Sequence, residues 1–501
     1  MVTFYFPQTL NALFRPTGMS NRPEKRNESH IGIYGIGVMG KNLALNFEEK
    51  GSTVSLYNRK VPGEQFLVDE FLAYEGLGKK FRGSTSPEQF VDSLERPRKI
   101  LLMVKAGDAV DEVIAELFPF LEAGDILIDG GNSHFQDTER RLEELAEKKI
   151  RYVGMGVSGG KEGARNGPSV MPGGDFEAWP ELEPLLLPVA ARAFDGSECC
   201  AWTGGGGAGH FVKMVHNGIE YADMQLIAET YDLMMRGLGM NADQIATHFS
   251  EWSDTELSGY LLEITAKILQ KKEPDGFPLI DRILDSADQK GTGRWISATA
   301  LELGIPLPVI TEAVHARFIS SLTEIRRVSS SSYQAPYPSP GSEKQKEKSL
   351  LHFAQALYAA RMTAYAEGFY LITEASKKYQ WGVDPAAIAR IWQGGCIIRS
   401  ELLRDIEQAF RHDITLEHLF MSPYYTSSFK KLLNGWRETA SLAVIHGIPA
   451  PAHTAALAQF DSLRSFRLPA NLIQAQRDYF GAHTYQRIDR LKGKSFTTDW
   501  E

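Results

Sequence analysis

The 501-residue chain has only three cysteines, Cys199, Cys200 and Cys396. Two are adjacent, the third is distant, and none stands in a metal-ligand spacing, so a disulfide framework is excluded and a reducing compartment is indicated. No apolar run approaches the ~18 residues that cross a bilayer. Basic residues are not in excess, because the net charge is -9, and this argues against a general nucleic-acid-binding protein. These absences leave a soluble globular protein without a membrane or nucleic-acid partner.

Residues 1–29 precede the first predicted strand and carry helix breakers such as Pro7, Pro16 and Pro23. They contain no acidic residue before Glu24, which is compatible with a transit peptide. We expect a disordered extension, and the transit peptide stays open as an alternative. The rest of the chain is long enough for two or three domains.

A glycine motif of the form GxGxxG follows the first apolar segment, residues 30–34. Gly35, Gly37 and Gly40 separate that predicted strand from a helical pattern, and a second strand at residues 53–57 comes next. This strand–turn–helix–strand context is what a dinucleotide-binding site requires, because the tight turn brings a pyrophosphate to the helix N-terminus. The sequence therefore predicts a Rossmann domain.

The second strand ends in Asn58, Arg59 and Lys60. NAD-preferring sites usually carry an acid at this point to bond the ribose 2′-hydroxyl, and none is present here. Two cations beside an amide suit a 2′-phosphate instead. We therefore predict NADP as the cofactor, with contacts from Gly35, Gly37, Val38, Met39, Gly40, Asn58, Arg59, Lys60, Val104, Lys105, Ala106 and Asn132.

Three more apolar strands are predicted at residues 99–104, 125–129 and 151–156. Apolar strands that alternate with helical patterns indicate a parallel sheet covered on both faces. Each strand ends in a turn rich in glycine or small polar residues, at 105–107, 130–133 and 157–160. Because ligands of open α/β sheets bind at the carboxyl ends of strands, these turns, with Asn132 and Ser158, are expected to form a cofactor and substrate rim.

Residues 203–226 join a glycine run to a helix with an unusual polar face. At ~100° per residue, five polar side chains fall within an arc of roughly 140° while apolar residues gather opposite. The five are Lys213, His216, Asn217, Glu220 and Tyr221. An ordinary surface helix would carry Glu/Lys pairs, whereas an amine, an imidazole, a carboxylate and a phenol together suit proton transfer.

Strand signals nearly vanish after this point. We predict an all-helical domain at residues 208–465, after a Rossmann domain at 30–207, and a C-terminal tail at 466–501 that carries Arg477 and His483. Residues 242–246 resemble residues 385–389, which suggests a duplicated helical unit. A doubled helical domain often also forms a dimer interface.

Four stretches together resemble the 6-phosphogluconate dehydrogenase family, and the likeness runs from Ile31 to the C-terminus. They are residues 130–133, 213–221, 289–293 and 476–485. The resemblance implies oxidative decarboxylation of 6-phospho-D-gluconate to D-ribulose 5-phosphate and CO2, with reduction of NADP, in the pentose phosphate pathway. It also implies a cytoplasmic homodimer and a reaction that needs no metal.

The resemblance also implies residue roles. Lys213 would be the general base, with a pKa lowered by burial and by neighbouring cations, and Glu220 would protonate the enediol. The substrate contacts implied are Asn132, Ser158, Gly159, Gly160, His216, Asn217, Tyr221, Lys290, Thr292, Arg317, Arg477 and His483. Of these, Arg477 and His483 would reach the site of the neighbouring subunit.

Two departures from the family pattern touch the cofactor. Gly37 stands where many members have alanine, and Lys60 where threonine is frequent. Two other functions stay open: a dehydrogenase of a short unphosphorylated β-hydroxyacid, and an NADP-binding module without turnover. The candidate phosphate ligands Lys290, Arg317 and Arg477 argue against the first, and the intact Lys213 and Glu220 argue against the second.

Overall fold

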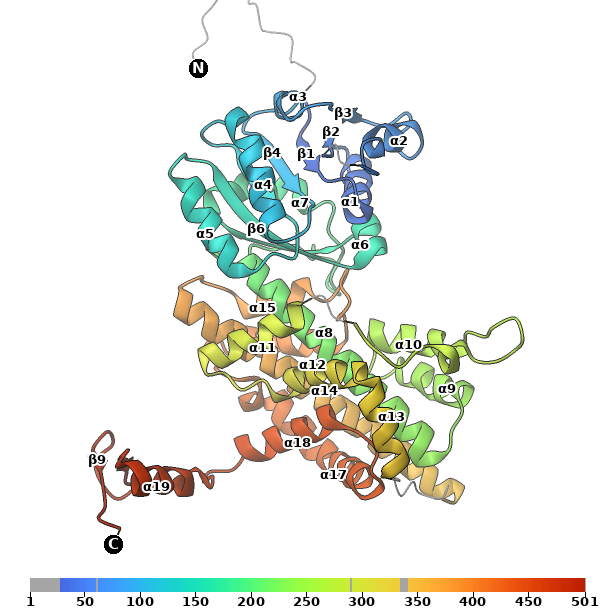
Figure 1. Ribbon diagram of the computed structural model, residues 1–501, viewed down its shortest axis with the longest axis vertical. Helices are drawn as coiled ribbons and strands as arrows, with labels where there is room; N and C mark the ends of the chain where they lie inside the picture. Colours follow the sequence, from blue (N-terminus) through green and yellow to red (C-terminus); the bar gives the residue numbers. More distant parts are fainter. Residues whose placement is uncertain (1–27, 60–61, 289–290, 334–340, 501) are drawn as a thin grey trace, which may run out of the picture.

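The computed structural model describes residues 28–59, 62–288, 291–333 and 341–500, and all statements below concern those residues. Figure 1 shows a sheet-containing lobe above a helical lobe, with the C-terminal segment extending away from the helical lobe. Within the described residues, no helix combines the length and the apolar character needed to cross a membrane.

The first lobe is built on a seven-stranded sheet in the order β3-β2-β1-β4-β5-β6-β7. The strands are β1 Ile31–Tyr34, β2 Val54–Tyr57, β3 Phe81–Gly83, β4 Lys99–Leu102, β5 Ile126–Asp129, β6 Arg151–Ser158 and β7 Ser169–Gly174. Strands β1 to β6 pair in parallel, and β7 joins β6 in antiparallel fashion. The five predicted strands are confirmed. The two edge strands were not predicted, since β3 is short and β7 contains Pro172 and two glycines, which are turn signals.

Helices cover both faces of the sheet, as Figure 1 shows. They are α1 Val38–Glu49, α2 Leu67–Ala73, α3 Pro87–Asp92, α4 Asp108–Leu117, α5 Phe135–Ala146, α6 Gly160–Asn166 and α7 Trp179–Leu186. Every residue of β1, β2, β4 and β5 is buried, which explains why these strands read as continuous apolar runs. The Rossmann fold is therefore confirmed.

The named elements of the second lobe, within its described residues, are all helices. Its helices are α8 Ala208–Asp232, α9 Ala242–Trp252, α10 Tyr260–Gln270, α11 Thr292–Leu303, α12 Pro308–Ser321, α13 Thr323–Ser332, α14 Glu343–Tyr379, α15 Pro385–Ile391, α16 Leu402–His412, α17 Pro423–His446 and α18 Pro451–Leu463. Helix α14 packs on α8 at Gly368, where a Cβ atom would lie 2.6 Å from Ile219. A buried ion pair of 2.8 Å between Asp223 and Arg361 joins the same two helices.

The predicted duplication has structural counterparts. Gly239 and Gly382 both adopt the left-handed conformation, and each is followed by a side-chain N-cap, Asn241 for α9 and Asp384 for α15. The sequence Gly-Ile-Pro-x-Pro occurs at residues 304–308 and again at 447–451, and in each copy the second proline starts a helix, α12 or α18. The two copies thus begin equivalent helices with equivalent turns.

Each long helix caps a helix of the other copy. Glu229 of α8 accepts hydrogen bonds from the backbone N–H groups of Ala452 and His453, both 3.0 Å long, at the start of α18. Glu367 of α14 accepts from Val309 and Ile310 at the start of α12, at 2.9 and 3.1 Å. The two halves of the helical lobe are therefore joined by an exchange of caps.

The C-terminal segment contains α19 Ala470–Gly481 and a short antiparallel pair, β8 Tyr485–Gln486 with β9 Ser495–Phe496. This pair was not predicted from sequence. Figure 1 shows α19 and β9 standing apart from the helical lobe. Large apolar side chains of this segment are exposed, among them Phe466, Leu472, Ile473 and Phe480.

Candidate active site

The predicted glycine turn opens a crevice at the carboxyl edge of the sheet, between β1 and β4. Gly35 has φ +101°, and a Cβ atom on Gly40 would lie 1.9 Å from the carbonyl oxygen of Gly35, so neither position accepts a side chain. Gly37 has no atom within 4 Å of its Cβ position, so an alanine fits there. The crevice has a volume of about 320 Å³ and is bordered by Gly35, Gly37, Asn58, Arg59, Glu64, Met103, Val104, Lys105 and Glu112, among others.

At the far end of this crevice, Asn58 accepts a hydrogen bond of 2.9 Å from the backbone N–H of Ile36. Its amide also donates to Glu64 at 3.2 Å, and Arg59 Nε lies 3.5 Å from the same carboxylate. The sequence predicted Asn58 and Arg59 here but missed Glu64, which reaches the site from the loop before α2. Lys60 lies outside the described residues.

The other predicted cofactor residues follow the carboxyl ends of β1, β4 and β5. Val38 and Met39 form the first turn of α1, and Val38 is 57% exposed. Lys105, which is exposed, and Ala106 follow β4, and the exposed Asn132 follows β5. The carboxyl ends of β1, β4 and β5 therefore present these residues along one edge, as expected for neighbouring parallel strands.

Lys213 lies in the first half of α8, buried against β6. A Cβ atom on Gly156 would meet the Lys213 Cβ at 2.5 Å, so the missing side chain on β6 is what lets the lysine stem fit. Burial lowers the pKa of the Lys213 amine from its ordinary value, while Glu220 and Cys396 act in the opposite direction. The expected effect of burial is thus confirmed, whereas the charged groups that act on this amine raise its pKa instead of lowering it.

A hydrogen-bonded chain links Lys213 to the predicted carboxylate site. Its Nζ lies 3.4 Å from His216 Nδ1, and His216 Nε2 lies 3.0 Å from the Ser158 hydroxyl. Burial, and then the Lys213 charge, lowers the pKa of His216 well below its usual value, so this ring is neutral. Asn217 Oδ1 lies 3.3 Å from the same ring. Ser158 ends β6, and the turn of Gly159 and Gly160 follows it, both in the left-handed region.

Glu220 stands beyond His216 along α8, with its Oε2 3.8 Å from His216 Nδ1. Burial raises the pKa of the Glu220 carboxyl, against the lowering influence of Lys213 and Arg317. A lysine with a lowered pKa and a glutamic acid with a raised one thus share one helix face. These shifts favour the neutral amine and the protonated carboxyl, which are the forms that a general base and a general acid need.

The next residue, Tyr221, marks the other end of the site. The Arg317 guanidinium of α12 lies 3.5 Å from the centre of the Tyr221 ring and donates to the Asp288 carbonyl at 3.1 Å. A Cβ atom on Gly293 would lie 2.6 Å from the same ring, so the start of α11 is held against Tyr221. Lys290 lies outside the described residues, and so does the side chain of Thr292.

Arg477 and His483 are not near this site within the chain. Arg477 lies on α19 and His483 in the turn after it, as predicted, and both are exposed. The structure adds a segment that the sequence analysis missed, the loop before Cys396. A Cβ atom on Gly159 would lie 2.5 Å from the carbonyl oxygen of Gly395, so this loop packs on the Ser158 turn. The glycine pair before Cys396 was the available signal.

The chain matches two family models, "NAD binding domain of 6-phosphogluconate dehydrogenase" over residues 30–204 and "6-phosphogluconate dehydrogenase, C-terminal domain" over residues 209–500. It is 50% identical to "6-phosphogluconate dehydrogenase, decarboxylating" of Schizosaccharomyces pombe, covering 95% of each chain. It is 49% identical to the Bacillus subtilis "6-phosphogluconate dehydrogenase, NADP(+)-dependent, decarboxylating", covering 95% of this chain and 99% of that protein.

A solved structure is similar along nearly the whole chain. It is described as the Plasmodium falciparum 6-phosphogluconate dehydrogenase "in its apo form, in complex with its cofactor NADP+ and in complex with its substrate 6-phosphogluconate". Its TM-score is 0.89 and its sequence is 39% identical, covering 94% of this chain and 100% of that chain. The likeness therefore includes both lobes.

Proposed function

The chain belongs to the 6-phosphogluconate dehydrogenase family, and we propose that the residues gathered around α8 carry out that family's reaction in the roles below. The activity is NADP-dependent oxidative decarboxylation of 6-phospho-D-gluconate to D-ribulose 5-phosphate and CO2. The observation that supports the roles best is the buried Lys213 amine, hydrogen-bonded to His216 on the helix that also carries Glu220.

The crevice at β1 and β4 fits NADP. The open space beside Gly37 admits a pyrophosphate at the start of α1, and Asn58 and Arg59 stand where the 2′-phosphate would bind. When bound, NADP supplies the acceptor for the hydride that leaves C3 of the substrate. Asn132, on the rim after β5, would orient both the nicotinamide end and a sugar hydroxyl.

Lys213 takes the proton from the C3 hydroxyl as the C3 hydride departs. The product is a 3-keto acid, in which the carbonyl lies β to the C1 carboxylate. The C1–C2 bond then breaks, CO2 leaves, and the electron pair moves toward the C3 oxygen. The Lys213 ammonium stabilises that oxygen, and Glu220 then protonates the enediol carbon to give the ketose.

Substrate orientation follows from the positions along α8. Ser158, with the Gly159–Gly160 turn, would take the C1 carboxylate, and His216 and Asn217 would hold the hydroxyls. Tyr221 and Arg317 would hold the phosphate, together with Lys290 and Thr292. Because Arg317 is half-buried, a phosphate would give its guanidinium a close ionic partner.

The same proposal includes a homodimer in which Arg477 and His483 complete the neighbouring site. Its support is the projection of α19 away from its own helical lobe and the exposed apolar side chains of the tail, which a second subunit would cover. A cytoplasmic location is proposed with it, and cell fractionation would test that location.

The decisive assay uses purified protein with 6-phosphogluconate and either NADP or NAD. We expect growth of the reduced-nicotinamide absorbance, CO2 release and a preference for NADP. Gluconate, which lacks the phosphate, serves as the matched substrate and should be turned over poorly. Equal rates with gluconate would favour a dehydrogenase of unphosphorylated acids, and no turnover of either substrate would reject the proposed function.

A further inference from the structure

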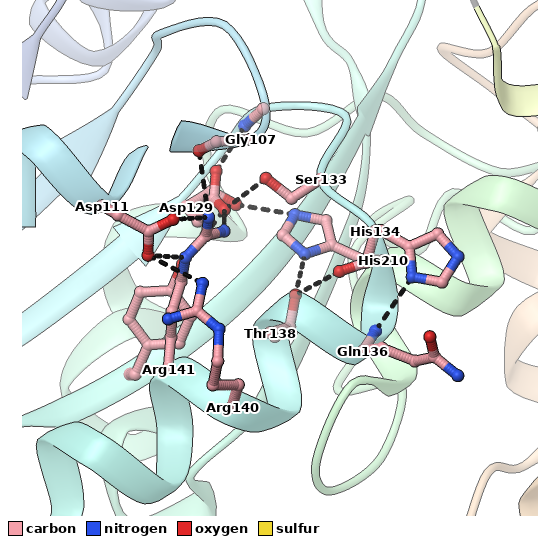
Figure 2. A network of polar contacts seen from close by, with 12 residues as sticks. Gly107, Asp111, Asp129, Ser133, His134, Gln136, Thr138, Arg140, Arg141 and His210 are labelled. Atoms are coloured by element: carbon pink, nitrogen blue, oxygen red, sulfur yellow. Dashed lines mark hydrogen bonds and ion pairs between the residues drawn. The ribbon is translucent and has the colours of Figure 1, made fainter. Parts of the chain in front are cut away.

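A buried polar network supports the turn that carries Asn132, as Figure 2 shows. Its centre is Asp129, the fully buried last residue of β5. The carboxylate accepts hydrogen bonds from the Gly131 backbone at 3.0 Å, the Ser133 hydroxyl at 2.6 Å and the Tyr152 hydroxyl at 3.0 Å. These bonds fix the shape of the 130–133 turn from below, so the position of Asn132 depends on Asp129.

A second arm of the network reaches the turn after β4. Arg141 is 1% exposed, and its Nη1 lies 3.5 Å from the Asp129 carboxylate. The guanidinium also donates to the Gly107 carbonyl at 3.0 Å and makes two bonds of 2.8 Å to Asp111. Figure 2 shows Arg141 between the two carboxylates. The turns that carry Lys105 and Asn132 are therefore held by one buried cation.

The third arm comes from the other lobe. His210 lies on α8, just before Lys213, and its ring is buried. Its Nε2 lies 3.0 Å from the Asp129 carbonyl oxygen, which can only accept, so Nε2 carries the proton. Burial lowers the pKa of His210 and keeps the ring neutral. Nδ1 is then free to accept from the Thr138 hydroxyl at 2.6 Å.

Two glycines of β6 let α8 approach this strand closely. A Cβ atom on Gly154 would lie 2.7 Å from His210 Nδ1, and one on Gly156 would lie 2.5 Å from the Lys213 Cβ. Glycines let the helix approach the strand but supply no side chain that sets its position along the strand. The bonds of His210 to Asp129 of β5 and Thr138 of α5, together with the Ser158–His216 bond at the end of β6, set that position.

We propose that His210 is a positioning residue, which acts through the Asp129 carbonyl to hold Lys213 on α8 and Asn132 after β5 at a fixed separation. The inference rests on the proposed function, because it concerns the base and the rim of that reaction. Hydride transfer needs reacting atoms aligned within about 3–3.5 Å, so a small shift of α8 along β6 would slow this step more than it weakens binding.

Two amide variants separate the bonds of His210. Glutamine places an N–H donor near the former Nε2 and keeps the bond to Asp129, whereas the shorter asparagine keeps only an acceptor for Thr138. We expect His210→Asn to lower kcat by about 10- to 100-fold, with KM changed less than about threefold. The primary deuterium isotope effect with substrate deuterated at C3 should rise. His210→Gln should recover most of the turnover and the wild-type isotope effect.

A readout without substrate or cofactor accompanies the assay. Hydrogen exchange in residues 130–134 of the free protein should be faster in His210→Asn than in His210→Gln. If His210→Asn folds poorly, Thr138→Val provides a second test. It removes the donor to Nδ1 at almost unchanged volume and frees the ring to take the wrong tautomer, so the isotope effect should rise here too.

Wild-type turnover in the same assay separates the two hypotheses. If the wild type fails to turn over 6-phosphogluconate, the proposed function is rejected. If the wild type is active, the positioning role is overturned by an asparagine variant with wild-type kcat, or by equal losses in both amide variants at an unchanged isotope effect.

Discussion

In its proposed role as general base, the Lys213 amine is buried and must also be uncharged, and this combination affects stability as well as chemistry. Its pKa is lowered, so between the lowered value and 10.5 the native state binds fewer protons than the unfolded chain. Stability therefore rises with pH across that window, and the buried amine costs stability below it.

Lys213→Met removes the amine and keeps most of the volume. We expect kcat to fall by at least about 100-fold, the usual contribution of general base catalysis. The free energy of unfolding should increase on the order of 1 kcal/mol, more at pH 6 than at pH 9. Paired activity assays and denaturant titrations at both pH values check this. A stability gain that does not change with pH would contradict the role of the buried charge.

Glu64 is a residue-scale feature of the cofactor crevice, where it pairs with both Asn58 and Arg59. A 2′-phosphate would compete with this carboxylate for Arg59 and would be repelled by it. We expect Glu64→Gln to tighten binding of 2′,5′-ADP by about three- to tenfold, roughly 0.6–1.4 kcal/mol. Calorimetry on the free protein measures this, with 5′-AMP as the control ligand. If Glu64→Gln instead weakens NAD binding, the result would indicate that Glu64 binds the ribose 2′-hydroxyl.

At the residue scale, the sequence was sufficient to group site residues that lie close together along one helix. Lys213, His216, Asn217, Glu220 and Tyr221 share one helix, so their helical spacing already placed them on one face. Other contacts join residues far apart in the chain, and nothing in the local pattern announces them. Glu64 reaches Arg59 across a loop, and His210 reaches Asp129 from another lobe.

At the scale of elements, the turn between β1 and α1 depends on two glycines in different ways. Gly40→Ala would drive a Cβ atom to 1.9 Å from the Gly35 carbonyl oxygen, so the turn has to open. We expect this variant to weaken NADP binding by at least about tenfold, because the pyrophosphate site is the turn itself.

Gly37→Ala is the matched control, since its added carbon meets no protein atom. Its affinity for NADP should stay within about threefold, a change below 1 kcal/mol. Fluorescence titration of NADP compares the two variants, and melting curves monitor folding. If both variants lose NADP affinity to a similar extent, direct contact with the cofactor, and not the shape of the turn, would explain the need for glycine at these positions.

The exchanged caps make the helical lobe sensitive to pH. Burial raises the pKa of Glu229 to about 7 and that of Glu367 to about 8, despite the opposing backbone N–H bonds. The unfolded chain releases these protons near pH 4.5, whereas the native state keeps them until pH 7–8. This contribution to stability is therefore complete below pH 4.5 and is lost as pH rises to about 8.

Glu367→Gln removes the titration and leaves an amide N–H facing a backbone N–H. We expect the variant to be less stable by about 1–3 kcal/mol at pH 5. The difference from the wild type should shrink as pH rises to 8. Urea unfolding at several pH values measures it, and an exposed carboxylate variant such as Glu343→Gln provides the control. A difference that is constant from pH 5 to 8 would mean that Glu367 does not titrate in this range.

Strands and helices could be predicted from the sequence where a single hydrophobic pattern determines them. Strands β1, β2, β4 and β5 are buried and read as apolar runs, whereas β3 and β7 are edge strands that carry turn residues. The polar face of helix α8 was predicted from its spacing, but not what it packs against. Lys213 of this face is buried against β6, and Tyr221 is buried against the start of α11.

At the scale of the whole molecule, the position of the tail predicts sharing of sites between subunits. Lys213→Met and His483→Ala should each be nearly inactive alone. When the two are unfolded together and reassembled, about half of the dimers are hybrids, and each hybrid has one site with an intact Lys213 and an intact tail.

The reassembled mixture should therefore recover about a quarter of wild-type activity. The rate after mixing measures this, and the same treatment of each variant alone is the control. Recovery far below this level would place His483 in its own chain's site or remove it from catalysis. The overall division at residues 207/208 and 465/466 stays a prediction, since the fold places helix boundaries near it but does not by itself define independent units.

The exchange of caps by Glu229 and Glu367 has a consequence for how such a doubled lobe could have arisen. In a single ancestral unit, the N–H groups at the start of the capped helix would have lacked a carboxylate acceptor, unless a second identical molecule supplied it. Two such molecules would have formed a symmetric pair, each capping a helix of the other, before their genes were fused. The present lobe would then correspond to such a dimer joined into one polypeptide.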